Sequence, residues 1–124
     1  MRGLLALRSD EGKLAEPSLR PSEAVELLAA QPIDALEAFA LIAQRRLAAD
    51  RARRYLDGWR FVRPRLNGRD VEELGVAHGP KVGEVLSALR RARLDGRTKT
   101  REDELALVRR MLSGRRRAVG ARRG

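Results

Sequence analysis

The sequence has no cysteine, a single histidine and only four aromatic residues, Phe39, Tyr55, Trp59 and Phe61. Without cysteine the chain can form neither disulfides nor thiolate metal sites. One histidine, His78, cannot make a histidine cluster, and we expect neither a metal site nor a bound cofactor in this chain. The 19 leucines, beside few aromatic and β-branched residues, favour helices over sheet.

A long hydrophobic run is also missing. The apolar run near the N-terminus, Leu4 to Leu7, has only four residues. A signal peptide needs about 7–15 apolar residues and a membrane helix about 20. We therefore expect a cytoplasmic protein with no membrane partner.

Negative charge is scarce in the second part of the chain. Residues 1–44 carry four basic and seven acidic side chains, a net −3, whereas residues 45–124 carry 23 basic and ten acidic ones, a net +13. Of the 27 basic residues 24 are arginine, whose planar guanidinium matches phosphate. Codon bias in a GC-rich genome would explain arginine over lysine, but not the concentration of charge in one part. The charge therefore suggests a polyanionic partner such as nucleic acid.

Hydrophobic spacing predicts an all-α chain, an array of about six short helices. We expect Gln31-Pro32 to end the first helix and Asp34 to cap the second. A slip in the apolar phase near residues 48–50 predicts a break before the third. The predicted helices cover about 21–30, 34–47, 51–62, 68–74, 80–95 and 101–113.

These helices predict four parts of the chain. They are a flexible lead-in over 1–20, a helical segment over 21–64, a second helical segment over 65–113 and a disordered basic tail over 114–124. In the third helix the apolar face holds Tyr55 and Trp59, which we expect in the core rather than as stacking platforms. Arg51, Arg53, Arg54 and Arg60 mostly take the other faces.

The second helical segment contains a helix–glycine turn–helix unit between Leu74 and Gly83. Gly75 permits a positive φ at the end of one helix, and Pro80 suits the first position of the next. We expect the amides of Lys81 and Val82 to be open, and Gly83 to allow close approach of a neighbour. Such a helix start binds phosphate well; the closure of a tight interhelical turn explains the glycines equally well.

The spacing of these motifs resembles the tail of bacterial CCA-adding tRNA nucleotidyltransferases and their poly(A) polymerase relatives. The resemblance extends over residues 21–112. It rests on Leu66-Asn67-Gly68-Arg69-Asp70-Val71, Leu74-Gly75, Gly79-Pro80, Val82-Gly83, Leu86, Leu89, Leu94-Asp95-Gly96 and Thr100-Arg101-Glu102, with Tyr55-Leu56 and Trp59-Arg60-Phe61-Val62-Arg63-Pro64 upstream. It implies a helical body and tail that bind tRNA.

The chain departs from that family where catalysis takes place. The glycine-serine pair and the two spaced aspartates of the catalytic head are absent, as is the nucleotide-selecting motif of the neck. The chain thus has no catalytic site that the resemblance can assign, and whether it serves an enzyme stays open. What carries over is the tail motif, as an element that contacts the RNA backbone.

The candidate RNA-binding residues come from this motif and from a basic cluster after it. Arg90, Arg91, Arg97, Lys99 and Arg101 gather around the end of the fifth helix, where a solvated face explains them equally well. Glu102-Asp103-Glu104 is typical of a helix start, with Thr100 as its cap, rather than of a metal site. The full set is Arg69, Gly79, Lys81, Gly83, Arg90, Arg91, Arg97, Lys99 and Arg101.

Three interpretations remain open. A separate polypeptide supplies the nucleotidyltransferase head and this chain holds the tRNA; or the chain is a free-standing binder of nucleic-acid backbones; or it is an inert fragment of a truncated enzyme gene. The first requires RNA and a head as partners, the second requires only nucleic acid, and the third requires neither.

The missing aspartate pair generates a first prediction. Without it the chain cannot build the two-metal arrangement that phosphoryl transfer needs. The purified chain, incubated with tRNA lacking its 3′ end, ATP, CTP and Mg²⁺, should add no nucleotide. Incorporation above a buffer control that persists through stringent purification would contradict this expectation.

Overall fold

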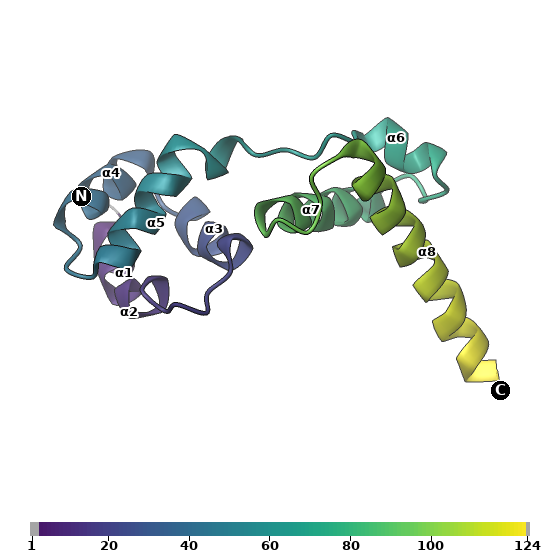
Figure 1. Ribbon diagram of the computed structural model, residues 1–124, viewed down its shortest axis with the longest axis horizontal. Helices are drawn as coiled ribbons and strands as arrows, with labels where there is room; N and C mark the ends of the chain where they lie inside the picture. The colour runs from purple at the N-terminus through teal and green to yellow at the C-terminus, as the bar shows by residue number, and fades with distance from the viewer. Residues whose placement is uncertain (1–2, 124) are drawn as a thin grey trace. The chain divides into compact units, whose positions relative to one another are not determined.

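The computed structural model describes residues 3–123, with side chains through Gly114 (Figure 1). The predicted all-α class is confirmed: the chain is 71% helical and contains no strand within the described residues. It divides into two compact units, one ending at Val62 and the other beginning at Arg63. The elements are α1 (Leu4–Ser9), α2 (Glu11–Leu14), α3 (Pro21–Ala29), α4 (Ile33–Ile42), α5 (Arg46–Asp57), the 3-10 helix η1 (Trp59–Phe61), α6 (Gly68–Glu73), α7 (Pro80–Leu94) and α8 (Arg101–Arg123).

The expected flexible lead-in over residues 1–20 is wrong. Its residues form α1 and α2, and Leu7 and Leu14 are both buried in the first unit. The Glu11 carboxylate accepts a 2.7 Å hydrogen bond from the backbone amide of Arg45, which ties α2 to the start of α5. Each helix is too short for its apolar residues to show a period, so the pattern was not visible in the sequence.

The predicted boundaries inside the first unit need two corrections. The break between the second and third helices lies at residues 43–45, ahead of the expected slip at 48–50, and Gly58 separates α5 from η1. Helix α4 begins at Ile33 with Pro32 as its cap residue, so Asp34 lies inside the first turn. The expected core is confirmed at Tyr55, which is buried, while Trp59 is only partly buried.

Arg51 is a buried arginine that the sequence pattern placed on a polar face. Its guanidinium donates from Nη1 to the carbonyl oxygens of Leu14 at 2.6 Å and Glu16 at 2.7 Å. It also donates from Nη2 to the carbonyl of Leu19 at 2.9 Å. One side chain of α5 thus satisfies the carbonyls that the end of α2 and the following loop leave without helical partners.

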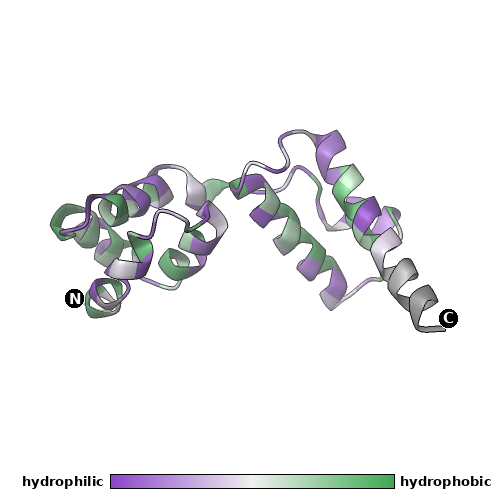
Figure 2. Ribbon diagram, turned by 60° about the horizontal axis from the view of Figure 1, so that its bottom comes forward, coloured by the Kyte–Doolittle hydropathy of each residue, from purple (hydrophilic) through white to green (hydrophobic). Residues whose placement is uncertain are grey.

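The second unit packs α6, α7 and α8 around an apolar cluster. Figure 2 shows hydrophobic and hydrophilic residues within the same helices, as expected where each helix buries only one face. The predicted starts of α6 and α7 are confirmed, at Gly68 and Pro80. The buried cluster comprises Leu66, Val71, Val76, Val85, Leu89 and Val108.

The end of α8 differs from expectation. We expected Gly114 to end it and residues 114–124 to be disordered, but the helix continues to Arg123. A single glycine costs a helix only about 1 kcal/mol relative to alanine, and no proline follows. Gly124 lies outside the described residues.

The role of Arg51 predicts a large loss of stability on substitution. Arg51→Met keeps the side-chain stem but leaves three carbonyls without a donor, each worth about 1–3 kcal/mol when buried. We expect the first unit to lose about 3 kcal/mol in urea unfolding. The fluorescence of Trp59, the only tryptophan, reports on this unit. The exposed Arg53→Met is the control and should stay within about 0.5 kcal/mol of the unchanged chain; equal midpoints for the two variants would contradict the assignment.

Candidate nucleic-acid interface

The turn between α6 and α7 is built by its caps and two glycines. The Asn67 side chain accepts from the Asp70 amide at 2.9 Å, and the Asp70 carboxylate accepts from the Asn67 amide at 3.0 Å, which closes the start of α6. Gly75 follows with φ 108° and Gly79 with φ 117°. Side-chain-bearing residues rarely adopt these angles, so both glycines are required by the backbone. Pro80 then occupies the first position of α7, as predicted.

Glu104, in the first turn of α8, holds the segment that leads into α6. Its side chain is fully buried, and its carboxylate accepts from the backbone amides of Arg65 and Leu66 at 3.0 Å each. Arg93 of α7 lies 3.8 Å from the same carboxylate. A single acid therefore joins α8, α7 and the segment that leads into α6. The sequence suggested only an interaction with the helix dipole.

An exposed carboxylate, Asp103, and a partly buried one, Asp70, reinforce this junction. Asp103 accepts from the Lys99 and Thr100 amides, and these backbone hydrogen bonds lower its pKa. The Asn67 amide, with a smaller contribution from Arg101 at 3.5 Å, lowers the pKa of Asp70. Because both pKa values are depressed in the folded chain, their stabilisation is present above the ordinary value of 3.8 and is lost as the pH falls below it.

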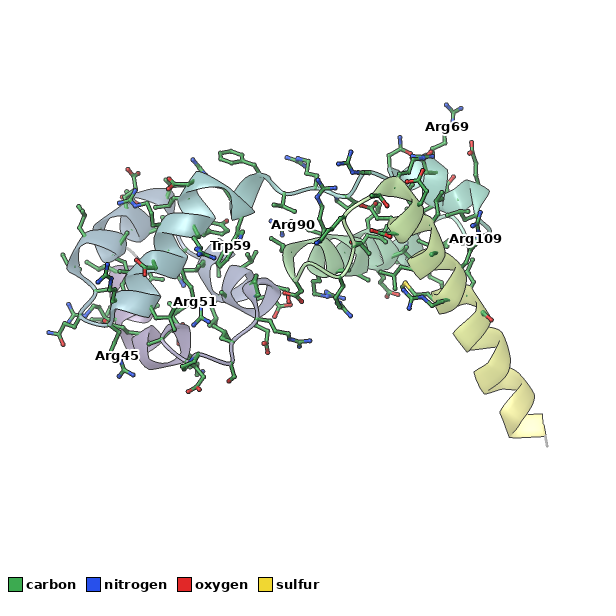
Figure 3. All side chains as sticks on the ribbon, viewed as in Figure 1. Arg45, Arg51, Trp59, Arg69, Arg90 and Arg109 are labelled. Atoms are coloured by element: carbon green, nitrogen blue, oxygen red, sulfur yellow. The ribbon has the colours of Figure 1, made fainter. Side chains whose placement is uncertain are left out.

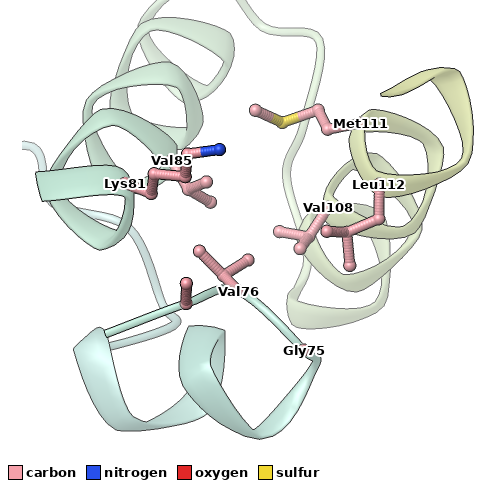
Figure 4. A pocket seen from close by; sticks show the side chains of 8 residues that line it. Gly75, Val76, Lys81, Val85, Val108, Met111 and Leu112 are labelled. Atoms are coloured by element: carbon pink, nitrogen blue, oxygen red, sulfur yellow. The ribbon is translucent and has the colours of Figure 1, made fainter. Parts of the chain in front are cut away.

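An apolar cavity lies between this turn and α8. It has a volume of about 220 Å³ and is lined mainly by Val76, Val85, Val108, Met111 and Leu112. Figure 4 shows the Lys81 side chain beside Val85, extended over the cavity with its amine at the end. The stem of Lys81 thus covers apolar surface while its charge stays exposed.

Two expectations about the turn's backbone are wrong. The Val82 amide is not open, because it donates to the Gly79 carbonyl at 3.1 Å. At Gly83 an added Cβ would meet no atom within 4 Å, so this glycine serves no close approach. The close approach is at Gly68, where an added Cβ would lie 3.4 Å from Val82 Cγ1. The Lys81 amide finds no acceptor in the part of the chain that the structure describes.

The predicted basic residues fall into two groups. Arg69, Arg91 and Arg97 are exposed, and none of their side chains has a hydrogen bond or ion pair to another described residue; Arg69 points away from α6 in Figure 3. By contrast, Arg101 pairs with Asp70, Lys99 acts on Asp103, and Arg90 is partly buried and engaged. Three of the five residues of the basic cluster thus interact with other described residues.

Several exposed basic residues were absent from the predicted set. Like Lys81, their side chains have no hydrogen bond or ion pair to another described residue. Their spacing along the chain does not distinguish them from other basic residues, because exposure and pairing depend on packing. They are Arg45, Arg46, Arg53, Arg54, Arg63, Arg109 and Arg110.

Within residues 3–123 no group of three potential ligands could hold a metal ion. In the same range no helix has the length and apolar character needed to cross a bilayer. His78 is exposed and lies 2.5 Å from Glu72, at the tip of the turn. What the site offers is therefore exposed positive charge on a helical frame.

The buried Glu104 carboxylate predicts a sharp effect of a small change. Glu104→Gln keeps the shape but removes the charge, which leaves Arg93 uncompensated and places an amide donor beside the Arg65 amide, which now donates to Oε2. We expect the second unit to lose about 3 kcal/mol, with faster amide hydrogen exchange at Arg65 and Leu66. The exposed Glu102→Gln, in the same turn, is the control and should change neither the stability nor the amide exchange. Unchanged exchange in Glu104→Gln would show that the hydrogen bonds of Glu104 contribute little.

Comparison with known proteins adds no family assignment. No protein-family model matches the chain. No curated protein matches it, and no solved structure matches it either.

Proposed function

We propose that this chain is an RNA-binding helical module that binds structured RNA, with tRNA as the expected ligand, through phosphate contacts and shape. The observation that carries the proposal is the set of exposed basic side chains between Arg45 and Arg110 that have no partner among the described residues. A guanidinium that the fold does not use can neutralise a phosphate and release its counterion.

The A-form geometry of double-stranded RNA determines how a protein can recognise it. The deep, narrow major groove of A-form RNA hides base edges from side chains, so double-stranded RNA is recognised by its backbone and its shape. Rigid helices that carry arginines suit this task, because phosphate contacts fix position and register. The chain offers such residues on α5, α6, α7 and α8, at Arg53, Arg69, Arg91 and Arg109 among others.

The resemblance to the tail of CCA-adding enzymes supports tRNA as the RNA. In this proposal the chain holds tRNA in the cytoplasm, and a separate nucleotidyltransferase head supplies the catalysis. The Gly75–Pro80 turn, set by the Asn67 cap and the Glu104 clamp, is the counterpart of the family's tail element. A free-standing backbone binder would use the same charges but would not prefer tRNA.

The proposal is tested at Lys81, whose charge extends from the turn. Lys81→Glu reverses that charge, yet an acidic residue near a helix start favours the dipole and should leave folding intact. We expect binding to tRNA at least about tenfold weaker, a loss of about 1.4 kcal/mol or more. Filter binding at fixed, moderate salt measures it, with circular dichroism melts of each variant alongside.

Two controls separate charge from packing. Lys81→Met keeps the stem that covers the apolar cavity and should weaken binding less than Lys81→Glu. Arg53→Glu makes the same charge reversal on α5 and should have the smaller effect if the turn is the main contact. If folded Lys81→Glu binds tRNA as well as the unchanged chain, the turn is only a helix connector. Equal affinity for tRNA and an unrelated RNA duplex would instead favour the free-standing backbone binder.

A further inference from the structure

The first unit contains a cavity of its own, of about 210 Å³, at the junction of α3, α5 and η1. Trp59 and Arg51, which both border it, are labelled in Figure 3. Apolar walls and charged groups meet here. The other residues that border it are Leu19, Pro21, Leu47, Asp50 and Arg54.

The size of this cavity limits its occupant. Pockets that enclose drug-sized ligands have about 300–1,000 Å³, so 210 Å³ accommodates one planar ring system rather than a whole nucleotide. The side chains of Trp59, Leu47 and Pro21 provide an aromatic and two apolar surfaces. A nucleobase of any identity stacks well on a tryptophan ring, so a nucleobase suits both the size and the surfaces of the cavity.

Two charged groups at the cavity, Asp50 and Arg54, have no partner within the described residues. Asp50 and Arg54 lie one turn apart on α5, where such residues commonly pair. Neither side chain, however, has a hydrogen bond or ion pair to another described residue. The Arg54 guanidinium, a donor, and the Asp50 carboxylate, an acceptor, are therefore both available to a ligand at this cavity.

The charge balance of the cavity favours one negative charge on the ligand. The buried guanidinium of Arg51 hydrogen-bonds only to neutral carbonyls and has no carboxylate partner within the described residues. With Arg54 it contributes two positive charges, against one negative charge from Asp50. The remaining single positive charge complements one phosphodiester, which is what each nucleotide of an RNA strand carries.

We propose that this cavity binds one unpaired guanine of an RNA strand. The base stacks on Trp59, the two oxygens of Asp50 accept from its N1–H and its 2-amino group, and Arg54 contacts the adjoining phosphate. Guanine alone presents two neighbouring donors on its Watson–Crick edge. The other bases place an acceptor opposite one carboxylate oxygen, which repels it. Single-stranded segments expose this edge, and sequence-specific RNA recognition commonly uses it.

The inference rests on the proposed function only in that the base belongs to RNA. It adds a site for one base in the first unit, whereas Lys81 and the α6–α7 turn belong to the second unit. The two proposals therefore fail independently. A variant at Lys81 should not affect the cavity, and a variant at Asp50 should not affect phosphate contacts at the turn.

The test uses the full chain and the fluorescence of its only tryptophan, Trp59. The probes are the single-stranded RNA pentamers UUGUU, UUAUU, UUCUU and UUUUU, with guanosine monophosphate as a free nucleotide, at moderate salt. We expect UUGUU to quench Trp59 and to bind at least about tenfold more tightly than the other three. Tighter binding of guanosine monophosphate than of UUGUU would identify a free-nucleotide site and would overturn the assignment to RNA.

Matched variants on α5 assign the groups. Asp50→Asn replaces one acceptor oxygen by a donor and should reduce UUGUU to the level of UUAUU, about tenfold. Asp57→Asn makes the same change at an exposed residue outside the cavity and should leave the preference intact. Arg54→Gln should weaken all four pentamers by similar factors, whereas Arg53→Gln should weaken them less. Circular dichroism melts establish that each variant is folded.

Three results would overturn the proposal. They are equal binding of the four pentamers, guanine preference that survives in folded Asp50→Asn, and pentamer binding that leaves Trp59 fluorescence unchanged. Lys81→Glu keeps the two proposals apart. If it leaves tRNA binding intact while Asp50→Asn abolishes guanine preference, the guanine site is supported and the RNA contact at the α6–α7 turn is rejected. The opposite pair of results retains the turn and rejects the cavity.

Discussion

The second unit depends on the burial of one carboxylate. The Glu104 carboxylate accepts hydrogen bonds from two backbone amides and lies beside Arg93. The segment before α6, the helix α7 and the start of α8 therefore meet at a single side chain. An unpaired backbone amide buried beside an apolar cluster costs about 1–3 kcal/mol, and here no strand or helix supplies its acceptor. The position of the glycine turn follows from that junction.

The first unit solves the same problem with the opposite charge. Arg51 donates to three carbonyls of the α2–α3 region, where the chain leaves one helix before it enters the next. Small helical units have many helix ends for their size, and each end leaves backbone groups without helical partners. Long charged side chains reach these groups from a neighbouring helix, which explains why both units bury a charge.

The sequence predicted what is encoded locally. The Thr100 cap, Pro80 at the start of α7 and the positive φ of Gly75 depend on a few adjacent residues, and the structure confirms them. The roles of Glu104 and Arg51 could not be predicted, because their partners lie 38 and 37 residues away at Leu66 and Leu14. Tertiary packing alone decides which acid or arginine of a helix is buried. For the same reason the basic surface could be predicted as a net charge but not residue by residue.

The way the fold uses its acids bears directly on its surface charge. In the second unit Asp70, Asp103 and Glu104 all accept from backbone amides. These three carboxylates accept hydrogen bonds from backbone amides. Among the described basic residues, Arg93 and Arg101 form ion pairs with them, and Lys99 interacts electrostatically with Asp103. The arginines beyond this junction, such as Arg69, Arg91 and Arg109, keep their charge unpaired among the described residues. A polyanion would therefore meet these arginines with no carboxylate partner among the described residues to compete for them.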